Sequence, residues 1–407
     1  MTAHLAWACQ WALMTVCCFA VIYGAFAALA TPVFGSEQSG DAPIGVSRPV
    51  PAVSVLKPLR GTEPRLYENL ATFCEQTHPC FQMLFGVSSP HDPAIAVVRR
   101  LQAAYPHVDI ELAVNASVHG SNLKVSNLIN MAGLARHDII VIADSDIAVE
   151  PDYLETVSAP LADPSVGVVT CLYHGQGVGG FWPRVGALFI NEWFAPSVRV
   201  AHAGGSRRFG FGATLALSCA TLARIGGFAA IKDSLADDYW LAEHVRALGL
   251  RTVLSEVTVA TDVIEPTFAT LWQRETRWLR TIRSVNRSGF ASLFLTFTTP
   301  WLLAGALLTL HFQADSGAAL HPFAGTAMAL TTAVGLVARV MLHVRSARYS
   351  RSFWRDLPLV PLRDILLAVQ WFAAAFGSNV VWRGERVPVD NRVAQPRPGI
   401  MKASDGR

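Results

Sequence analysis

Charged side chains are scarce in this sequence. Only 15% of the 407 residues are Asp, Glu, Lys or Arg, 52% are hydrophobic, and the mean hydropathy is +0.34. Because soluble domains typically carry about 25% charged residues, this composition excludes an ordinary soluble enzyme and places part of the chain in a membrane. Lysine and arginine are also absent before Arg48, so the positive charge is uneven enough to orient the chain across a bilayer.

Cysteine pairs at metal-binding spacing are missing as well. The seven cysteines are odd in number, none forms a Cys-x-x-Cys pair, and several lie in apolar runs. We therefore expect free thiols in a reducing compartment, and neither a disulfide framework nor a zinc site.

Long apolar segments predict the membrane-spanning part. Residues 5–29 hold no charge and can cross about 30 Å of hydrocarbon as a helix. Residues 290–312 and 322–344 predict a hairpin whose tip lacks lysine and arginine, and five arginines follow between positions 345 and 363. The positive-inside rule places these arginines and the globular region in the cytoplasm. A last apolar run, 365–382, has arginines on both sides, and we expect it to lie along the membrane rather than cross it.

Between residues 53 and 264, short apolar runs alternate with amphipathic stretches. This alternation predicts an α/β fold with a mostly parallel sheet covered by helices on both faces. Ligands of such sheets bind beyond the carboxyl ends of the strands. The run "DIIVIADSD" ends there with Asp144 and Asp146. Two carboxylates at this place suit Mg²⁺ or Mn²⁺ bridging to a diphosphate, although a solvated turn with Asp146 as a helix cap would produce the same residues.

Two later stretches also contain charged side chains that are candidates for catalysis or ligand binding. Asp237 and Asp238 begin an amphipathic segment, where acidic residues also complement a helix dipole. Residues 271–287 carry five arginines at spacings of three and four, together with Trp272 and Trp278. A helix of this kind before a membrane span is equally typical of an interfacial helix that binds anionic head groups.

Several segments, in order, resemble the ceramide glucosyltransferase family of membrane-bound inverting glycosyltransferases. They are "VSVLKPLRG", "SSPHDPA", "LKVSNL", "DSD", "DDYWL" and "RETRW", and the similarity covers about residues 53–382. The resemblance implies a glycosyltransferase A fold, that of nucleotide-diphospho-sugar transferases, with added transmembrane helices. The complete Asp-Ser-Asp departs from the ceramide enzymes, which commonly have another residue at position 146, and it brings the chain closer to a bacterial branch.

The resemblance also implies a role for each matching residue. Asp238 is implied as the general base and Asp146 as the ligand of Mg²⁺ or Mn²⁺. The residues implied to bind the UDP-sugar or its leaving diphosphate are Asp92, Lys124, Asp144, Arg274, Arg277 and Trp278. Such a set suits inverting transfer, which needs one base and positive charge on the leaving group but no covalent nucleophile.

The expected reaction moves a sugar from a UDP-sugar to the hydroxyl of a membrane lipid. Within the family, the bacterial hopanoid branch is the nearest in appearance, so UDP-N-acetylglucosamine and bacteriohopanetetrol are the first choices. Ceramide glucosylation with UDP-glucose is the alternative. A sterol or a diacylglycerol is also an open choice of acceptor. A polysaccharide synthase is an open choice of activity, although two or three transmembrane spans are too few to form a good polysaccharide pore. The expected partners are the donor, the acceptor and the bilayer, without nucleic acid.

The expected organisation combines these segments. It comprises a transmembrane helix at 1–34, a linker at 35–52, a cytoplasmic glycosyltransferase domain at 53–266, an interfacial basic and aromatic helix at 267–289, a transmembrane hairpin at 290–345, and a basic segment at 346–407 with a further membrane-associated helix. The expected location is a bacterial inner membrane, with several spans.

Overall fold

The computed structural model describes residues 2–29, 50–314, 321–350, 352–382 and 385–389. Nearly all of the expected linker therefore lies outside the described residues. The chain forms two compact units, each built from separate stretches. We call the first the sheet unit, which includes residues 50–173 and 206–261, and the second the helical unit, which includes residues within 2–29, 174–205 and 262–389.

An eight-stranded sheet is the frame of the sheet unit, with the order β3-β2-β1-β4-β7-β6-β8-β5. The strands are β1 (Val53–Pro58), β2 (Phe81–Val87), β3 (Asp109–Val114), β4 (Ile139–Ile142), β5 (Ile147–Ala148), β6 (Val166–Gly177), β7 (Leu215–Ser218) and β8 (Arg251–Val263). The last residues of β6 and β8 belong to the helical unit.

The sheet is mixed in strand direction. The part β3-β2-β1-β4 is parallel, whereas β7 runs antiparallel to β4 and β6, and β5 runs antiparallel to β8. The predicted α/β class is confirmed, and the parallel arrangement holds for the first four strands, whereas β5 and β7 run antiparallel to their neighbours. The hydrophobic pattern identifies strands, but it does not specify which distant strands become neighbours and in which direction they pair.

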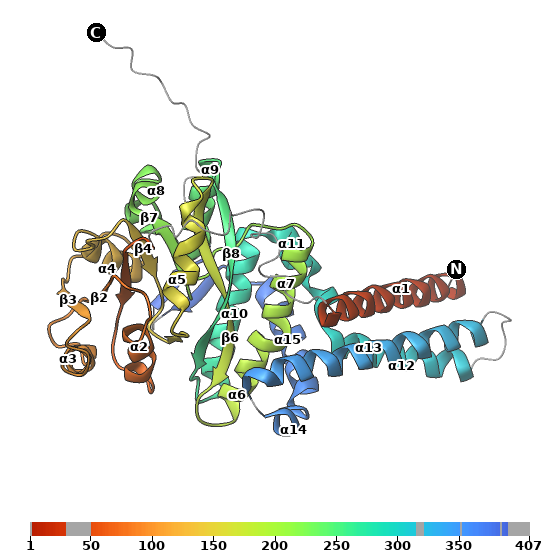
Figure 1. The fold of residues 1–407 in the computed structure, drawn as a ribbon. Coiled ribbons are helices and arrows are strands. Elements are labelled where there is room, and N and C mark those ends of the chain that lie inside the picture. The colour runs from red at the N-terminus through yellow and green to blue at the C-terminus, as the bar shows by residue number, and fades with distance from the viewer. Residues whose placement is uncertain (1, 30–49, 315–320, 351, 383–384, 390–407) are drawn as a thin grey trace, which may run out of the picture. The chain divides into compact units, whose positions relative to one another are not determined.

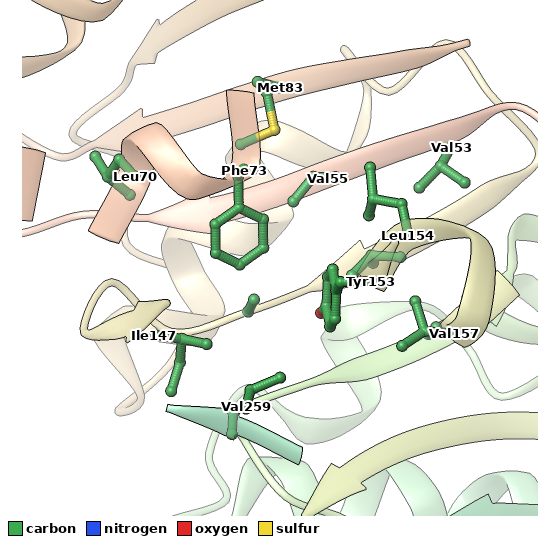
Figure 2. Packing of buried hydrophobic residues seen from close by; sticks show 14 of the residues in the cluster. Val53, Val55, Leu70, Phe73, Met83, Ile147, Tyr153, Leu154, Val157 and Val259 are labelled. Atoms are coloured by element: carbon green, nitrogen blue, oxygen red, sulfur yellow. The ribbon is translucent and has the colours of Figure 1, made fainter. Parts of the chain in front are cut away.

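Side chains of the strands alternate between two hydrophobic cores. On β1, Val53 and Val55 face one core and Leu56 faces the other. In the first core, shown in Figure 2, Phe73 and Tyr153 meet edge to face with ring centroids 5.5 Å apart. This core is covered by α2 (Leu66–Cys74), α3 (Ala94–Ala104) and α5 (Tyr153–Ser158). The second core is covered by α4 (Leu123–Ala132), α8 (Cys219–Arg224) and α9 (Asp237–Ala247).

Three long helices lie side by side in the helical unit (Figure 1): α1 (Thr2–Leu29), α12 (Thr298–Ala314) and α13 (His321–Ser350). Two segments in the described part of the chain, Ala8–Leu29 and Phe323–Arg348, are long and apolar enough to cross a membrane. Residues 287–311 form a third candidate span only if the two helices in this stretch, which meet at a bend of 52°, are taken together as one span.

The first arm of the predicted hairpin, 290–312, is not one continuous helix. A short helix, α11 (Arg287–Ser292), precedes the bend, and α12 starts at Thr298. Pro300 lies in the first turn of α12, where a missing N–H is tolerated. The carboxylate of Asp364 accepts hydrogen bonds from the backbone N–H (3.2 Å) and the hydroxyl (2.6 Å) of Thr299, and it satisfies that helix end.

The remaining helices of this unit begin with α6 (Phe181–Phe189), a π-helical turn (Ile190–Phe194) and α7 (Ala195–Ala203). They continue with α10 (Phe268–Val285), α14 (Phe353–Asp356) and α15 (Leu359–Ala375), and a hairpin of β9 (Asn379–Trp382) and β10 (Glu385–Pro388) follows. The expected basic helix at 267–289 corresponds to α10, and Thr267 caps it in a capping box with Thr270. The apolar run 365–382 is not one helix, because α15 ends at Ala375 and Gly377 has a φ of 86°.

Candidate active site

Acidic side chains meet a lysine at the carboxyl end of β4. Asp144 and Asp146 lie between β4 and β5, Lys124 lies in the first turn of α4, and Asp237 and Asp238 begin α9. Lys124 Nζ lies 2.6 Å from Asp144 Oδ1 and 3.6 Å from Asp237 Oδ2. The tertiary structure thus joins three of the motifs that the sequence singled out.

The ammonium group of Lys124 is held in its charged form. Burial by itself would lower the pKa of Lys124, but the carboxylates of Asp144 and then Asp237 outweigh this effect and raise it. Asn122 positions the start of α4, since its side chain accepts a hydrogen bond from Val125 N and donates to Ser234 O. A permanent cation is therefore fixed beside the Asp-x-Asp motif.

Asp238 is oriented by two backbone amides. Gly212 N donates to Asp238 Oδ2 and Tyr239 N donates to Asp238 Oδ1, both at 2.8 Å. Burial, and then the neighbouring carboxylate of Asp237, raise the pKa of Asp238 to about 6. A carboxylate with this pKa is a better proton acceptor near neutral pH than an ordinary aspartate.

Gly212 lets these groups approach one another. A Cβ atom at this position would lie 2.9 Å from Asp144 Oδ2, 3.3 Å from Lys124 Nζ and 3.6 Å from Asp238 Oδ2. Any larger residue would therefore push into the cluster. Sequence reasoning missed Gly212, because its role depends on what lies opposite it in space.

A second lysine, Lys57, lies beneath the Asp-x-Asp motif and was also missed. Its side chain is completely buried, its Nζ lies over the ring of Phe73 at 3.4 Å from the centroid, and it donates to the carbonyl of Asp144 at 2.8 Å. Burial lowers the pKa of Lys57 to about 7, although the charge of Asp146 acts in the opposite direction. The available signal was one lysine within the apolar strand "VSVLKP".

Asp92 organises the loop after β1. Its carboxylate accepts hydrogen bonds from Gly61 N (3.0 Å) and from Ala94 N (2.9 Å), the first residue of α3. Glu63 of the same loop accepts a hydrogen bond from the Ser145 hydroxyl at 3.3 Å. The loop therefore connects Asp92 to the residue between the two aspartates of the motif.

Asp146 is the predicted metal ligand, and the hydroxyl of Thr261 donates to its Oδ2 at 2.9 Å. Hydrogen bonds of this kind orient ligating carboxylates. Among the described residues, no group of three His, Cys, Asp or Glu side chains could hold a metal ion. A cation here would take one or two carboxylates and complete its shell with phosphate oxygens and water, which is the usual mode of Mg²⁺. The donor set fits such an ion.

The three predicted residues of the "RETRW" segment lie on α10 in the helical unit. Arg274 Nη1 pairs with Glu265 Oε2 at 2.5 Å, and its guanidinium lies 4.4 Å from the ring centroid of Trp278. Trp278 in turn packs against Phe189, with ring centroids 5.7 Å apart. Arg274 and Trp278 thus form one stacked group.

Arg277 points to a different surface of α10. It lines a pocket of about 290 Å³ together with Trp272, Gln273, Thr276, Arg280, Asn379 and Val380. Arg280 donates to the carbonyl of Asn379 at 2.6 Å, and Arg283 donates to the carbonyls of Ala375 and Gly377. Arg280 and Arg283 therefore stabilise the chain after α15, a role that the head-group interpretation of the arginines did not include.

Comparisons with known proteins agree on one family. The sequence model described as Glycosyl transferase family 21 matches residues 12–394. Ceramide glucosyltransferase 1 of Caenorhabditis elegans is 27% identical over 232 residues, which are 57% of this chain and 50% of that protein. A ceramide glucosyltransferase of Komagataella phaffii is 34% identical over 102 residues, 24% of this chain and 20% of that protein. The chain thus spans about half the length of the nematode relative.

One solved structure also aligns along most of the chain. It is the mannosyltransferase PcManGT from Pyrobaculum calidifontis, in complex with GDP-Man and Mn²⁺. It is 21% identical, with a TM-score of 0.49 over 90% of this chain and 98% of that chain.

Proposed function

Because the chain belongs to glycosyl transferase family 21, we propose that it transfers a sugar, with inversion, from a UDP-sugar to the hydroxyl group of a membrane lipid. The observation that carries this proposal is the convergence of Lys124, Asp144 and Asp238 at the carboxyl end of β4. In this cluster a lysine partly neutralises the acidic groups, and one carboxylate has a raised pKa. Such a site is suited to accepting a proton and to stabilising a leaving diphosphate.

The relatives support a ceramide-type acceptor and glucose as the sugar, because their names state ceramide glucosyltransferase activity. This pair was the alternative to transfer of N-acetylglucosamine to bacteriohopanetetrol, and the comparisons favour it. We therefore rank UDP-glucose with ceramide first, and UDP-N-acetylglucosamine with bacteriohopanetetrol second.

Asp238 is the proposed general base. As the acceptor hydroxyl oxygen attacks C1 of the sugar, its proton passes to the carboxylate of Asp238. The bond between C1 and the phosphate oxygen breaks with its electron pair on the departing UDP. Attack and departure occur on opposite faces of C1, so the configuration inverts, and no covalent enzyme intermediate is needed.

The departing diphosphate needs compensating charge. We assign Lys124 to the donor phosphates, and Arg274, Arg277 and Trp278 to the leaving group, as the family resemblance implies. Asp144 and Asp92 are assigned to the sugar and the nucleoside of the donor. The guanidinium groups are suited to this task because they donate paired hydrogen bonds to phosphate oxygens.

A divalent cation is part of the proposal. Asp146, oriented by Thr261, would hold Mg²⁺ or Mn²⁺, and the ion would supply Lewis-acid stabilisation of the diphosphate charge. Lys57 supports the same loop from below through the carbonyl of Asp144.

Membrane attachment completes the proposal. The two apolar helices, and the third if the bent chain is one span, suit an enzyme whose acceptor stays in the bilayer. We propose a multi-pass protein of the bacterial inner membrane with the sheet unit on the cytoplasmic side, in accord with the arginines that follow the hairpin.

The test is direct transfer in membranes that contain the overproduced protein. UDP-glucose and UDP-N-acetylglucosamine, each labelled in the sugar, are offered separately with ceramide or bacteriohopanetetrol, and the lipid extract is separated. We expect label in one lipid with wild type and none with Asp238→Asn. Equal labelling by wild type and Asp238→Asn would show that this site does not carry the reaction.

A further inference from the structure

Helix α15 has two chemically different faces. The face that is buried in the helical unit carries charged and polar groups among apolar ones: Arg363, Asp364 and Gln370 are almost completely enclosed beside Val360, Leu367 and Ala374. Arg363 Nη1 lies 2.7 Å from Glu275 Oε2 of α10, and Gln370 Nε2 donates to the same oxygen at 2.8 Å. Such buried charges are tolerated only because they are paired.

The other face of α15 is exposed and apolar. Its residues recur at spacings of three and four, which places them on one side of a helix. They are Leu362, Ile365, Val369 and Phe372, and Phe376, which directly follows the helix, continues the spacing. Phe372 and Phe376 are each 62% exposed and contact each other edge to face at 5.2 Å. We call these five residues the apolar stripe.

We propose that α15 lies along the membrane surface, with the apolar stripe in contact with lipid acyl chains. The helix that carries the stripe contacts elements that have membrane character. Helix α15 packs against α12, and Asp364 pairs with Arg339 of the apolar helix α13 at 2.9 Å. Just before α15, Trp354 is 80% exposed beside Arg355, a combination typical of the interface between acyl chains and head groups.

Several features favour a helix along the surface over one that crosses. At 1.5 Å per residue, the 17 residues of α15 span about 25 Å, less than the hydrocarbon core of about 30 Å. Helix α15 is also not one of the two described helices that are long and apolar enough to cross. Arginines lie at both ends, Arg355 before the helix and Arg283 on the carbonyls at its end, and the positive-inside rule therefore places both ends on one side.

This placement has a consequence for α10. Glu275 lies within the "RETRW" segment, between Arg274 and Arg277, and its bonds to Arg363 and Gln370 hold α10 against α15. A surface-bound α15 would therefore keep the arginine helix next to the membrane, where a lipid acceptor is available. The inference deepens the proposed function in this respect, but its test does not depend on transfer.

The test measures membrane depth at single positions. The full chain, with its native cysteines replaced by serine or alanine, receives one cysteine at position 362, 365, 369, 372 or 376, which carries an environment-sensitive fluorophore. The protein is placed in phosphatidylcholine and phosphatidylglycerol nanodiscs. Quenching is measured with aqueous iodide and with lipids that carry nitroxides at a shallow or a deep carbon. Arg99→Cys, exposed on α3, and Leu307→Cys, exposed on α12, are the aqueous and deep controls.

We expect all five stripe positions to be protected from iodide and quenched more strongly by the shallow than by the deep nitroxide. A depth that increases and then decreases along the stripe would mean that α15 crosses, and would overturn the proposal. Quenching by iodide as strong as at Arg99→Cys would show that water covers the stripe. Protection from every quencher would show that protein covers it. Either result would overturn the proposal as well. Shallow insertion in a protein that transfers no sugar would sustain this inference while refuting the proposed function.

Discussion

Lys124 Nζ lies 2.6 Å from Asp144 Oδ1, and this pair joins the first turn of α4 to the end of β4. The same ammonium group faces Asp237 at 3.6 Å and lowers the pKa of Asp238, partly offsetting the effects of burial and of Asp237. One cation thus couples the proposed phosphate site to the proposed general base.

Replacing Lys124 by methionine should shift the pH dependence of the reaction. Without the ammonium group, the carboxylates of Asp144, Asp237 and Asp238 repel one another more strongly, so the pKa of Asp238 should rise further. We expect the acidic limb of kcat/KM against pH to move to higher pH, together with weaker donor binding. Lys232→Met is the matched control, and identical profiles for the two variants would contradict the coupling.

For wild type, activity should depend on the ionisation of Asp238. A base works only when deprotonated, and burial raises the pKa of this group to about 6. We therefore expect kcat/KM to rise with pH up to about 6 and to level off above it. Asp238→Asn should bind the donor nearly normally and lose about two to four orders of magnitude in kcat. If Asp237→Asn is the inactive variant and Asp238→Asn is active, the base is Asp237.

Asp146→Ala should remove the metal dependence of donor binding. The metal retains few anionic protein ligands without this carboxylate, and the diphosphate charge is then poorly compensated. Titration of UDP-sugar with and without Mg²⁺ or Mn²⁺, by calorimetry, measures the effect. Thr261→Val, which deletes only the hydrogen bond to Asp146, should weaken the metal effect without abolishing it. A variant Asp146→Ala that still needs the metal would refute the assignment.

Lys57→Met should separate stability from donor binding. Methionine fills a similar volume beside Phe73, and burial already disfavours the charged form of Lys57, whose pKa is lowered to about 7, so the thermal midpoint should not fall by more than a few degrees. The carbonyl of Asp144 loses its donor, however, and the motif loop should be less well positioned. We expect roughly tenfold weaker donor binding, the effect of about one hydrogen bond. Normal donor binding in this variant would make Lys57 a packing residue only.

The arginines of α10 should differ in importance. Arg277→Lys should reduce kcat/KM roughly 10- to 100-fold, because the planar fork for the diphosphate is lost. Arg287, exposed at the start of α11, is the matched control. Arg283 is unsuitable as a control because it stabilises the end of α15. Equal losses for Arg277→Lys and Arg287→Lys would identify the arginines as a head-group-binding face.

Local pattern was sufficient for the first four strands and for the acidic motifs. Fully apolar runs such as "IIVI" can only be buried strands or buried helix segments, and their length and their end at two aspartates favoured the strand. The long uncharged N-terminal segment was readable for the same reason, since only a helix satisfies its backbone in an apolar environment. The bent span was not readable, because Pro300 is tolerated both at a helix start and within a kinked membrane helix.

The cluster itself depended on tertiary structure. Lys124 and Asp237 are 113 positions apart, and only the packing of α4 and α9 on the same face of the sheet brings them together. Gly212 and Lys57 are ordinary residues in the sequence, and they gain their roles from the atoms around them. The sequence alone determined which kinds of chemical group were available and where apolar and amphipathic segments alternate, since these follow from local composition and periodicity. The pKa of Asp238, the pairing of Lys124 and the burial of Glu275 against Arg363 were decided by the fold, because they depend on distance and solvent exclusion between residues that the chain order does not relate.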